Sequence, residues 1–201
     1  MFVKICGLKQ AEDVECAVEA GANAVGFVLT ESPRQVRVAD VDLLVDLVPP
    51  GVLVVGVFQG MPIAQVRAIV AGSRIQAVQL HGGYAQADFA ELKDLPVQLI
   101  RATSFDDGEQ AQVGSHGEDY LILDSKHAGS GQTWDWSPLA RTTVAGQWML
   151  AGGLTPENVA EAIAATRPWG VDVSSGVEST RGVKDTGRIR EFLAAARFCA
   201  G

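Results

Sequence analysis

A cysteine and an aspartate each end a short apolar run in this chain, a pattern typical of strands that deliver a side chain to a site. Cys6 follows the run 3–5, and Asp124 follows the run 120–123. A thiol and a carboxyl group can both act as general acids or bases. Arg34 adds a cation whose charge does not vary with pH. Together these residues predict proton-transfer chemistry on an anionic ligand.

Each of these residues also has an ordinary structural interpretation. A cysteine such as Cys6 is often a small buried hydrophobic residue, and Asp124 is equally suited to anchoring its own loop. Arg34 is a solvated surface charge in the simpler interpretation. His81 at the end of the run 76–80 either lines a pocket or satisfies a loop carbonyl. Local sequence leaves these alternatives open.

Three segments rich in glycine and serine are the candidates for binding the anion: Gly129-Ser130-Gly131, Gly152-Gly153 and Ser174-Ser175-Gly176. Glycine lets backbone N–H groups approach phosphate oxygens closely, and a short helix after Ser175 would point its positive end at the anion. The alternative is that these glycines only shape tight turns.

Eight apolar, β-branched runs predict the strands that must position these groups: 2–5, 24–29, 52–58, 76–80, 97–101, 120–123, 147–150 and 170–173. Helical patterns lie between them at 11–20, 39–47, 63–70, 87–92, 106–113, 138–141, 156–165 and 186–198, with Thr155 as the expected N-cap of the seventh. This alternation indicates a parallel sheet covered by helices. We therefore expect residues 1–201 to form a single (β/α)8 barrel.

An open, doubly wound sheet is the structural alternative, but the GxGxxG expected after its first strand is replaced by Cys6-Gly7-Leu8-Lys9. In a (β/α)8 barrel the reactive groups sit at the carboxyl ends of the strands. The segments after strands 7 and 8, with Gly152-Gly153 and Ser174 to Gly176, occupy the positions where such barrels commonly bind phosphate.

Composition excludes several function classes. The formal net charge is −8 and the basic residues are dispersed, so we expect no nucleic-acid partner. Three cysteines without CxxC spacing argue against a disulfide framework, and with three scattered histidines they argue against a metal site. Cys16 and Cys199, on predicted helical faces, are interpreted as packing residues.

No apolar run approaches the roughly 18 residues of a membrane-spanning helix. The chain enters the run 2–5 at once, without the features of a secretory signal. We expect a cytoplasmic, monomeric protein whose partner is a small phosphorylated molecule.

The motifs in their order resemble the phosphoribosylanthranilate isomerase family of tryptophan biosynthesis. The resemblance runs from residue 2 to the last predicted helix, and it rests mainly on Lys4-Ile5-Cys6-Gly7, Ser32-Pro33-Arg34, Gln79-Leu80-His81-Gly82, Leu123-Asp124, Gly152-Gly153-Leu154-Thr155-Pro156 and Asp172-Val173-Ser174-Ser175-Gly176-Val177-Glu178.

The resemblance implies a (β/α)8 barrel without cofactor or metal that catalyses an Amadori rearrangement of N-(5'-phosphoribosyl)anthranilate. It implies that Cys6 is the general base, Asp124 the general acid and Arg34 the residue that holds the anthranilate carboxylate. The phosphate would bind at Gly129 to Gly131, at Gly152-Gly153 and at Ser174 to Gly176. His81 and Asp172 are further candidates for lining the pocket.

Two classes of rival interpretation remain at this point, namely a related phosphate-binding enzyme of either of two kinds and a protein without catalytic activity. A sugar-phosphate epimerase would need a His/Asp metal cluster, and the related isomerase of histidine biosynthesis would carry an aspartate where Cys6 stands. A phosphate-binding sensor without catalytic activity would keep the glycine segments but would need neither Cys6 nor Asp124.

Overall fold

The computed structural model describes residues 1–105, 112–125 and 134–198. Eight parallel strands close into a barrel in chain order, with the last strand pairing to the first. The strands are β1 (Phe2–Cys6), β2 (Ala24–Val28), β3 (Leu53–Gln59), β4 (Ala77–His81), β5 (Gln98–Ser104), β6 (Tyr120–Asp124), β7 (Trp148–Leu150) and β8 (Gly170–Val173). The predicted barrel and its eight strands are confirmed.

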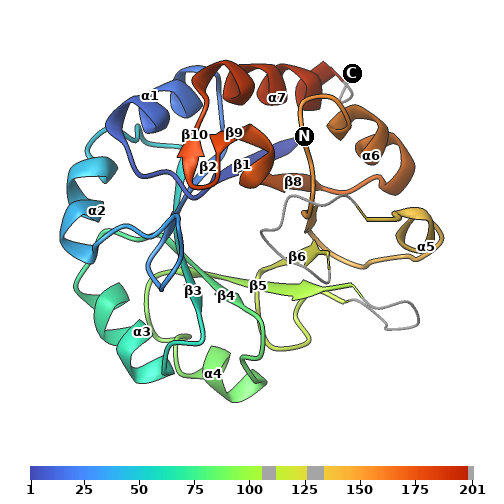
Figure 1. Ribbon diagram of the computed structural model, residues 1–201. Coiled ribbons are helices and arrows are strands. Elements are labelled where there is room, and N and C mark those ends of the chain that lie inside the picture. The colour runs from blue at the N-terminus through green and yellow to red at the C-terminus, as the bar shows by residue number, and fades with distance from the viewer. Residues whose placement is uncertain (106–111, 126–133, 199–201) are drawn as a thin grey trace.

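Helices surround the barrel on its outer face, as Figure 1 shows. They are α1 (Ala11–Glu19), α2 (Val38–Val45), α3 (Ile63–Ala71), α4 (Gln86–Ala90), α5 (Ser137–Ala140), α6 (Val159–Thr166) and α7 (Thr186–Phe198). The larger apolar cluster lies between strands and helices and includes Val3, Phe27, Leu80 and Phe192. Burial of this layer is the main driving force that holds helices against the sheet.

Three expectations about local structure need correction or lie outside the described residues. The predicted helix at Thr155 is wrong in its start, because residues 156–158 form a turn and α6 begins at Val159 after the N-cap Asn158. Most of the predicted helix at 106–113 lies outside the described residues. The short helix expected after Ser175 is one 3-10 turn, η1 (Ser175–Val177).

An antiparallel hairpin that the sequence analysis did not predict follows this turn. It consists of β9 (Glu178–Thr180) and β10 (Val183–Lys184) and lies in front of β1 and β2 in Figure 1. Because β10 leads directly into α7, the hairpin lies on the path from the end of β8 back to the outer layer.

The barrel interior holds a second, smaller apolar cluster with one charged side chain running through it. Ile122, Met149 and other small or aliphatic residues pack there, and Lys4 is fully buried beside them. Room for Lys4 comes from Gly26 on the neighbouring strand: a Cβ at that position would lie 3.2 Å from Lys4 Cε and 3.0 Å from Cys6 Sγ. The glycine in β2 therefore makes space for both side chains of β1.

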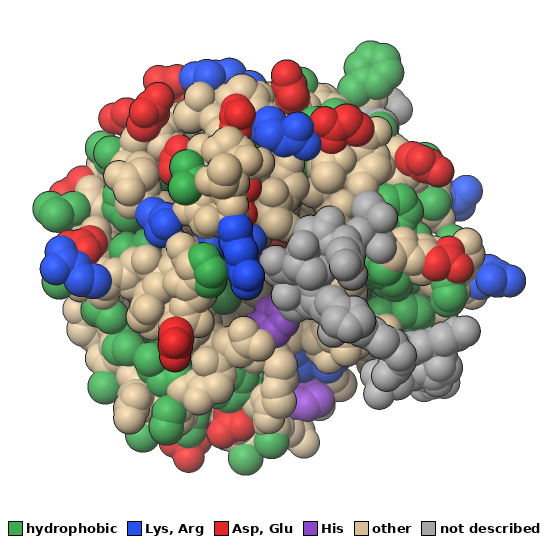
Figure 2. All heavy atoms as spheres, in the orientation of Figure 1, with side chains coloured by type: hydrophobic (Ala, Val, Ile, Leu, Met, Phe, Trp, Pro, Cys, Tyr) green, Lys and Arg blue, Asp and Glu red, His purple; other side chains and the backbone are tan. Residues whose placement is uncertain are grey.

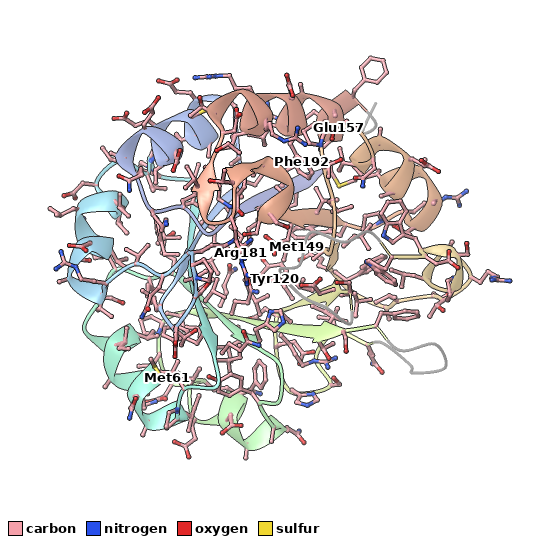
Figure 3. The ribbon with its side chains drawn as sticks, in the orientation of Figure 1. Met61, Tyr120, Met149, Glu157, Arg181 and Phe192 are labelled. Atoms are coloured by element: carbon pink, nitrogen blue, oxygen red, sulfur yellow. The ribbon has the colours of Figure 1, made fainter. Side chains whose placement is uncertain are left out.

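Stacked aromatic rings close the amino end of the barrel. Trp169 lies between Phe2, with ring centroids 4.5 Å apart, and Tyr120, with centroids 5.3 Å apart. Figure 3 labels Tyr120 near the centre of the ring of strands. Because large rings fill this end, we expect a ligand to enter at the carboxyl ends of the strands.

Candidate active site

A pocket of about 270 Å³ opens at the carboxyl ends of the strands. Its wall includes six of the residues predicted from sequence: Cys6, Arg34, His81, Asp124, Asp172 and Ser174. They come from β1, β4, β6, β8 and the loops after β2 and β8, so the barrel brings together residues from the whole length of the chain.

Gly7 explains why a glycine follows the cysteine. Its backbone lies in the left-handed region at φ 76°, which residues with a side chain rarely adopt. A Cβ there would lie 2.8 Å from Arg34 Cδ and 3.1 Å from Ser174 Oγ. Glycine thus turns the chain after Cys6 and lets Arg34 and Ser174 approach the end of β1.

Lys4 and Asp172 form an ion pair directly beneath the thiol. Lys4 Nζ donates to Asp172 Oδ1 at 2.8 Å, and both side chains are buried. Burial lowers the pKa of Lys4, but the charges of Asp172 and Cys6 outweigh it and raise that pKa above its ordinary value. Burial raises the pKa of the Cys6 thiol, and the Lys4 ammonium opposes that rise. Lys4 is therefore a charged ammonium beside a thiol that is protonated at neutral pH.

Asp124 holds a proton much more readily than an ordinary carboxyl group. Burial raises the pKa of Asp124 to about 6, and the negative charge of Asp172 adds to the rise. The opposing effect is a hydrogen bond of 2.6 Å from the Ser125 N–H to Asp124 Oδ1. A carboxyl group with this pKa can act as a proton donor near neutrality.

Arg34 is buried and is held by an acidic partner from the hairpin. Its Nε donates to Glu178 Oε1 at 2.6 Å and a terminal nitrogen donates to Glu178 Oε2 at 3.0 Å. Lys184 Nζ donates to the same carboxylate at 3.0 Å and to the Ser174 carbonyl at 2.8 Å. Burial alone would raise the pKa of Glu178, but Arg34 and its other partners hold it at about 2. The carboxylate is therefore charged and fixes the plane of the guanidinium.

Arg181 adds a second cation to the pocket from the turn of the hairpin. Its side chain lines the pocket and is solvent-exposed, and it has no hydrogen bond or ion pair with another described residue. Figure 3 shows Arg181 over the centre of the barrel, and Figure 2 shows basic side chains near the centre of the same face. Arg181 therefore offers a positive charge to an anionic ligand, and the carboxylate of Glu31 also lines the pocket.

The glycine segments after β7 and β8 lie against each other. A Cβ on Gly176 would lie 1.7 Å from the Leu154 carbonyl oxygen, so only glycine fits where the two segments touch. Asn158 braces the first segment by donating from Nδ2 to the Gly153 carbonyl at 2.9 Å. The N–H groups of Gly152 and Gly153 have no hydrogen bond to another described residue. Gly129, Ser130 and Gly131 lie outside the described residues.

The remaining predicted residues are placed as follows. His81 ends β4 and lines the pocket, and burial lowers its pKa. Ser175 and Gly176 lie in η1.

Among the described residues no group of three or more His, Cys, Asp and Glu side chains is arranged to hold a metal ion. None of the described helices is both long enough and apolar enough to cross a membrane.

Sequence reasoning missed the pairing of Lys4 with Asp172 and the roles of three further charged residues: Glu178, Arg181 and Lys184. Lys4 and Glu178 stood inside motifs that the sequence analysis quoted, and a lysine within an apolar strand is itself a signal of a buried ion pair. For Lys184 and Arg181 no local signal exists, because only the hairpin brings them to the pocket.

Comparison with known proteins decides among the activities that this geometry allows. A family model for N-(5'phosphoribosyl)anthranilate (PRA) isomerase matches residues 3–195. The chain belongs to this family. It is 42% identical over 212 residues to the N-(5'-phosphoribosyl)anthranilate isomerase of Rhodospirillum rubrum, covering 98% of this chain and 97% of that protein.

Solved structures agree with this assignment. The crystal structure of TrpF from Jonesia denitrificans is 42% identical to this chain and has a TM-score of 0.91. The match covers 100% of this chain and 98% of that one. A phosphoribosyl anthranilate isomerase in complex with reduced 1-(o-carboxyphenylamino)-1-deoxyribulose 5-phosphate is 32% identical, with a TM-score of 0.81 and coverage of 98% and 99%. A solved structure of mutually generated monomers of the dimeric isomerase from Thermotoga maritima is 32% identical, with a TM-score of 0.84 and coverage of 98% of this chain and 99% of that one.

As a member of the family, the protein converts N-(5'-phosphoribosyl)anthranilate into 1-(2-carboxyphenylamino)-1-deoxyribulose 5-phosphate in tryptophan biosynthesis. The epimerase, the isomerase of histidine biosynthesis and the sensor without activity are thereby set aside.

Proposed function

We propose that residues 1–201 form one catalytic domain in which Asp124 and Cys6 act as the general acid and the general base of this isomerisation. The observation that carries the proposal is that both side chains line one pocket from different strands, β6 and β1. A substrate held between them would present one face to each group.

Asp124 is suited to the first step. Its neutral carboxyl group gives a proton to the ring oxygen of the ribose while the bond between C1 and that oxygen breaks, and the nitrogen lone pair forms an iminium at C1. The pKa of about 6 leaves part of the Asp124 population protonated at pH 7. Burial of the carboxyl group is the largest cause of that pKa.

Cys6 is suited to the second step. The iminium makes the C2 hydrogen acidic, the thiolate form of Cys6 takes that proton and becomes the thiol, and the electron pair forms the C1–C2 double bond of an enolamine. The enolamine gains a proton at C1 and loses the C2 hydroxyl proton, which gives the ketone without net change in atoms. Lys4 supports this step because its charge opposes the rise in the Cys6 pKa that burial causes.

Arg34 and the glycine segments would hold the two anionic ends of the substrate. Glu178 engages Nε and one terminal nitrogen of Arg34, which leaves the other terminal nitrogen for the anthranilate carboxylate. The unpaired N–H groups of Gly152 and Gly153 and the start of η1 suit the phosphate. Fixing both ends places C1 and C2 between acid and base, and such positioning lowers a barrier substantially.

The assay that tests the proposal follows the loss of phosphoribosylanthranilate fluorescence after anthranilate, phosphoribosyl pyrophosphate and the transferase that joins them are mixed with the protein. We expect the wild type to accelerate the loss and both Cys6→Ser and Asp124→Asn to reduce kcat by a hundredfold or more. Full activity in Cys6→Ser would make the thiol a packing residue and would overturn the mechanism.

We propose further that the protein is a cytoplasmic monomer. Only four large apolar side chains of the described residues are exposed, Val38, Leu43, Val183 and Phe198. They come from α2, the hairpin and the end of α7, which does not suit the continuous apolar face of a stable dimer. A base that must remain a free thiol also suits a reducing compartment. Sedimentation at micromolar concentration tests the oligomeric state, and a mass of two chains would overturn the monomer.

A further inference from the structure

Gln79 lies in the wall of the pocket and has no role in the mechanism above. It sits on β4 between Ala77 and His81, pairs with Val57 of β3 and Ile100 of β5, and is 3% exposed. Since side chains of a strand alternate between its faces, Gln79 points into the barrel like His81. It therefore belongs to the floor of the pocket that Cys6 and Asp124 also line.

The side-chain amide of Gln79 has no hydrogen-bond partner among the described residues. Its Oε1 is buried and unpaired. Gln76 on the same segment shows the contrast, because its Oε1 accepts from the Val54 N–H at 3.0 Å. A buried acceptor without a partner is costly and uncommon in folded proteins. An unpaired amide that faces a binding pocket is therefore best explained by a partner that arrives with the ligand.

The chemistry of that partner follows from the other groups in the pocket. Lys4 and Asp172 are paired with each other, Asp124 Oδ1 accepts from Ser125, and Arg34 is held by Glu178. The Gln79 amide is neutral and offers both donors and an acceptor. A neutral hydroxyl matches it, whereas a carboxylate or phosphate suits the cation and the glycine segments.

The positions of the strands indicate which hydroxyl. C2 of the substrate carries both the hydrogen that Cys6 removes and a hydroxyl, and the two project in different directions from one carbon. β1 pairs with β2 and β8, and β4 lies three strands away around the barrel, next to β5, which is opposite β1. A C2 hydrogen that faces Cys6 on β1 therefore leaves its hydroxyl directed toward the opposite wall.

We propose that Gln79 is a substrate-binding residue whose side-chain amide makes a hydrogen bond with the C2 hydroxyl of the sugar. The proposal rests on the proposed roles of Cys6 and Asp124. The contact orients C2 toward Cys6, so it acts on kcat as well as on binding.

The test compares two ligands with two proteins by calorimetric titration. The ligands are reduced 1-(o-carboxyphenylamino)-1-deoxyribulose 5-phosphate, which keeps a C2 hydroxyl, and its 2-deoxy form. Wild type should bind the hydroxylated ligand at least tenfold more tightly, and Gln79→Met, which keeps the length of the side chain without its polar atoms, should bind both equally. Discrimination that persists in Gln79→Met would overturn the proposal.

Controls separate this result from loss of structure and from failure of the wider mechanism. The melting temperature of Gln79→Met should be no lower than that of wild type, because the amide makes no hydrogen bond within the described protein. Gln79→Leu is a second variant, for which we expect the same melting temperature and the same loss of ligand discrimination. Gln76→Met, at the exposed glutamine, should keep full discrimination. The binding comparison needs no turnover, so an inactive wild type would refute the assigned catalytic roles while the ligand comparison still decided Gln79.

Discussion

Lys4 Nζ lies 2.8 Å from Asp172 Oδ1 in the centre of the barrel, where the lysine side chain is fully buried. A buried ion pair contributes little net stability relative to apolar residues, but removal of one partner leaves an uncompensated charge that costs about 3 to 5 kcal/mol. Its position beneath Cys6 therefore gives this pair a role that stability alone does not explain.

Lys4→Met should lower stability by about 3 to 5 kcal/mol, because Asp172 loses its partner. It should also move the pKa of Cys6 further upward, since the ammonium no longer opposes burial. The double variant Lys4→Met/Asp172→Asn removes both charges and should recover stability without recovering activity. Denaturant unfolding and the pH dependence of kcat/KM measure the two effects, and an unshifted alkaline limb in Lys4→Met would contradict the link to Cys6.

The pH profile of kcat/KM should be a bell. The reaction needs protonated Asp124, which is lost above its pKa of about 6, and ionised Cys6, which forms only near a pKa raised above the ordinary value. Below pH 6 the carboxyl group is fully protonated and the thiolate falls tenfold per unit. Between the two pKa values the loss of protonated Asp124 cancels the gain of Cys6 thiolate, so kcat/KM is level. Above both pKa values the thiolate fraction is constant and the protonated fraction of Asp124 falls, so kcat/KM declines. A profile that rises without limit on the alkaline side would exclude Asp124 as the acid.

Asp124→Asn should be less active and more stable than wild type at pH 7. The folded-state pKa of Asp124 is raised, so the contribution of this group to stability is fully present below the unfolded value of 3.8 and is lost as the pH rises through about 6. That shift corresponds to about 2 to 3 kcal/mol. Asparagine carries no charge and should escape the decline, with equal stabilities near pH 3.

The matched control for this variant is Asp119→Asn. Asp119 lies just before the amino end of β6, where its carboxylate accepts from the Leu99 N–H at 2.8 Å. Asparagine can keep that hydrogen bond, and the pocket is at the other end of the strand, so activity should not change. A loss of stability in Asp124→Asn at pH 7 would show that the charged carboxylate is not disfavoured by the fold.

Arg34→Ala should mainly raise KM. A charge-assisted hydrogen bond to the substrate carboxylate is worth about 1.5 to 3 kcal/mol, which corresponds to a loss of roughly ten- to a hundredfold in kcat/KM. Arg37→Ala is the control, because Arg37 is in the same loop but its side chain is 81% exposed and pairs with Asp40. Equal kinetics in the two variants would reduce Arg34 to a structural partner of Glu178.

Gly152→Ala should reduce kcat by displacing the acid. Gly152 has φ 86°, and its Cβ would lie 2.6 Å from both Asp124 Oδ1 and the Ser125 nitrogen. Gly51→Ala carries the same kind of backbone strain at φ 98° with no atom within 4 Å, so it separates strain from displacement. Steady-state kinetics and thermal unfolding of both variants provide the test, and equal kcat in the two would show that Asp124 tolerates the methyl group.

The sequence by itself determined the barrel and the placement of its reactive side chains. Apolar runs of four to seven residues with helices between them are a local pattern, and a run that ends at Cys6 or Asp124 puts that residue at the carboxyl end of its strand. The order of motifs indicated the family for the same reason, because each motif is contiguous. Thr155 was the local pattern that misled, since Asn158 takes the N-cap position while it braces Gly153.

Only the tertiary structure decided how the site is charged. Lys4 and Asp172 are 168 residues apart and meet because β8 closes on β1, and Arg34 and Glu178 are 144 residues apart and meet because the unpredicted hairpin folds over the barrel mouth. The pKa values of Cys6 and Asp124 depend on burial and on these distant charges. Burial and Coulomb interactions are set by distances through space, which no local spacing in the sequence encodes.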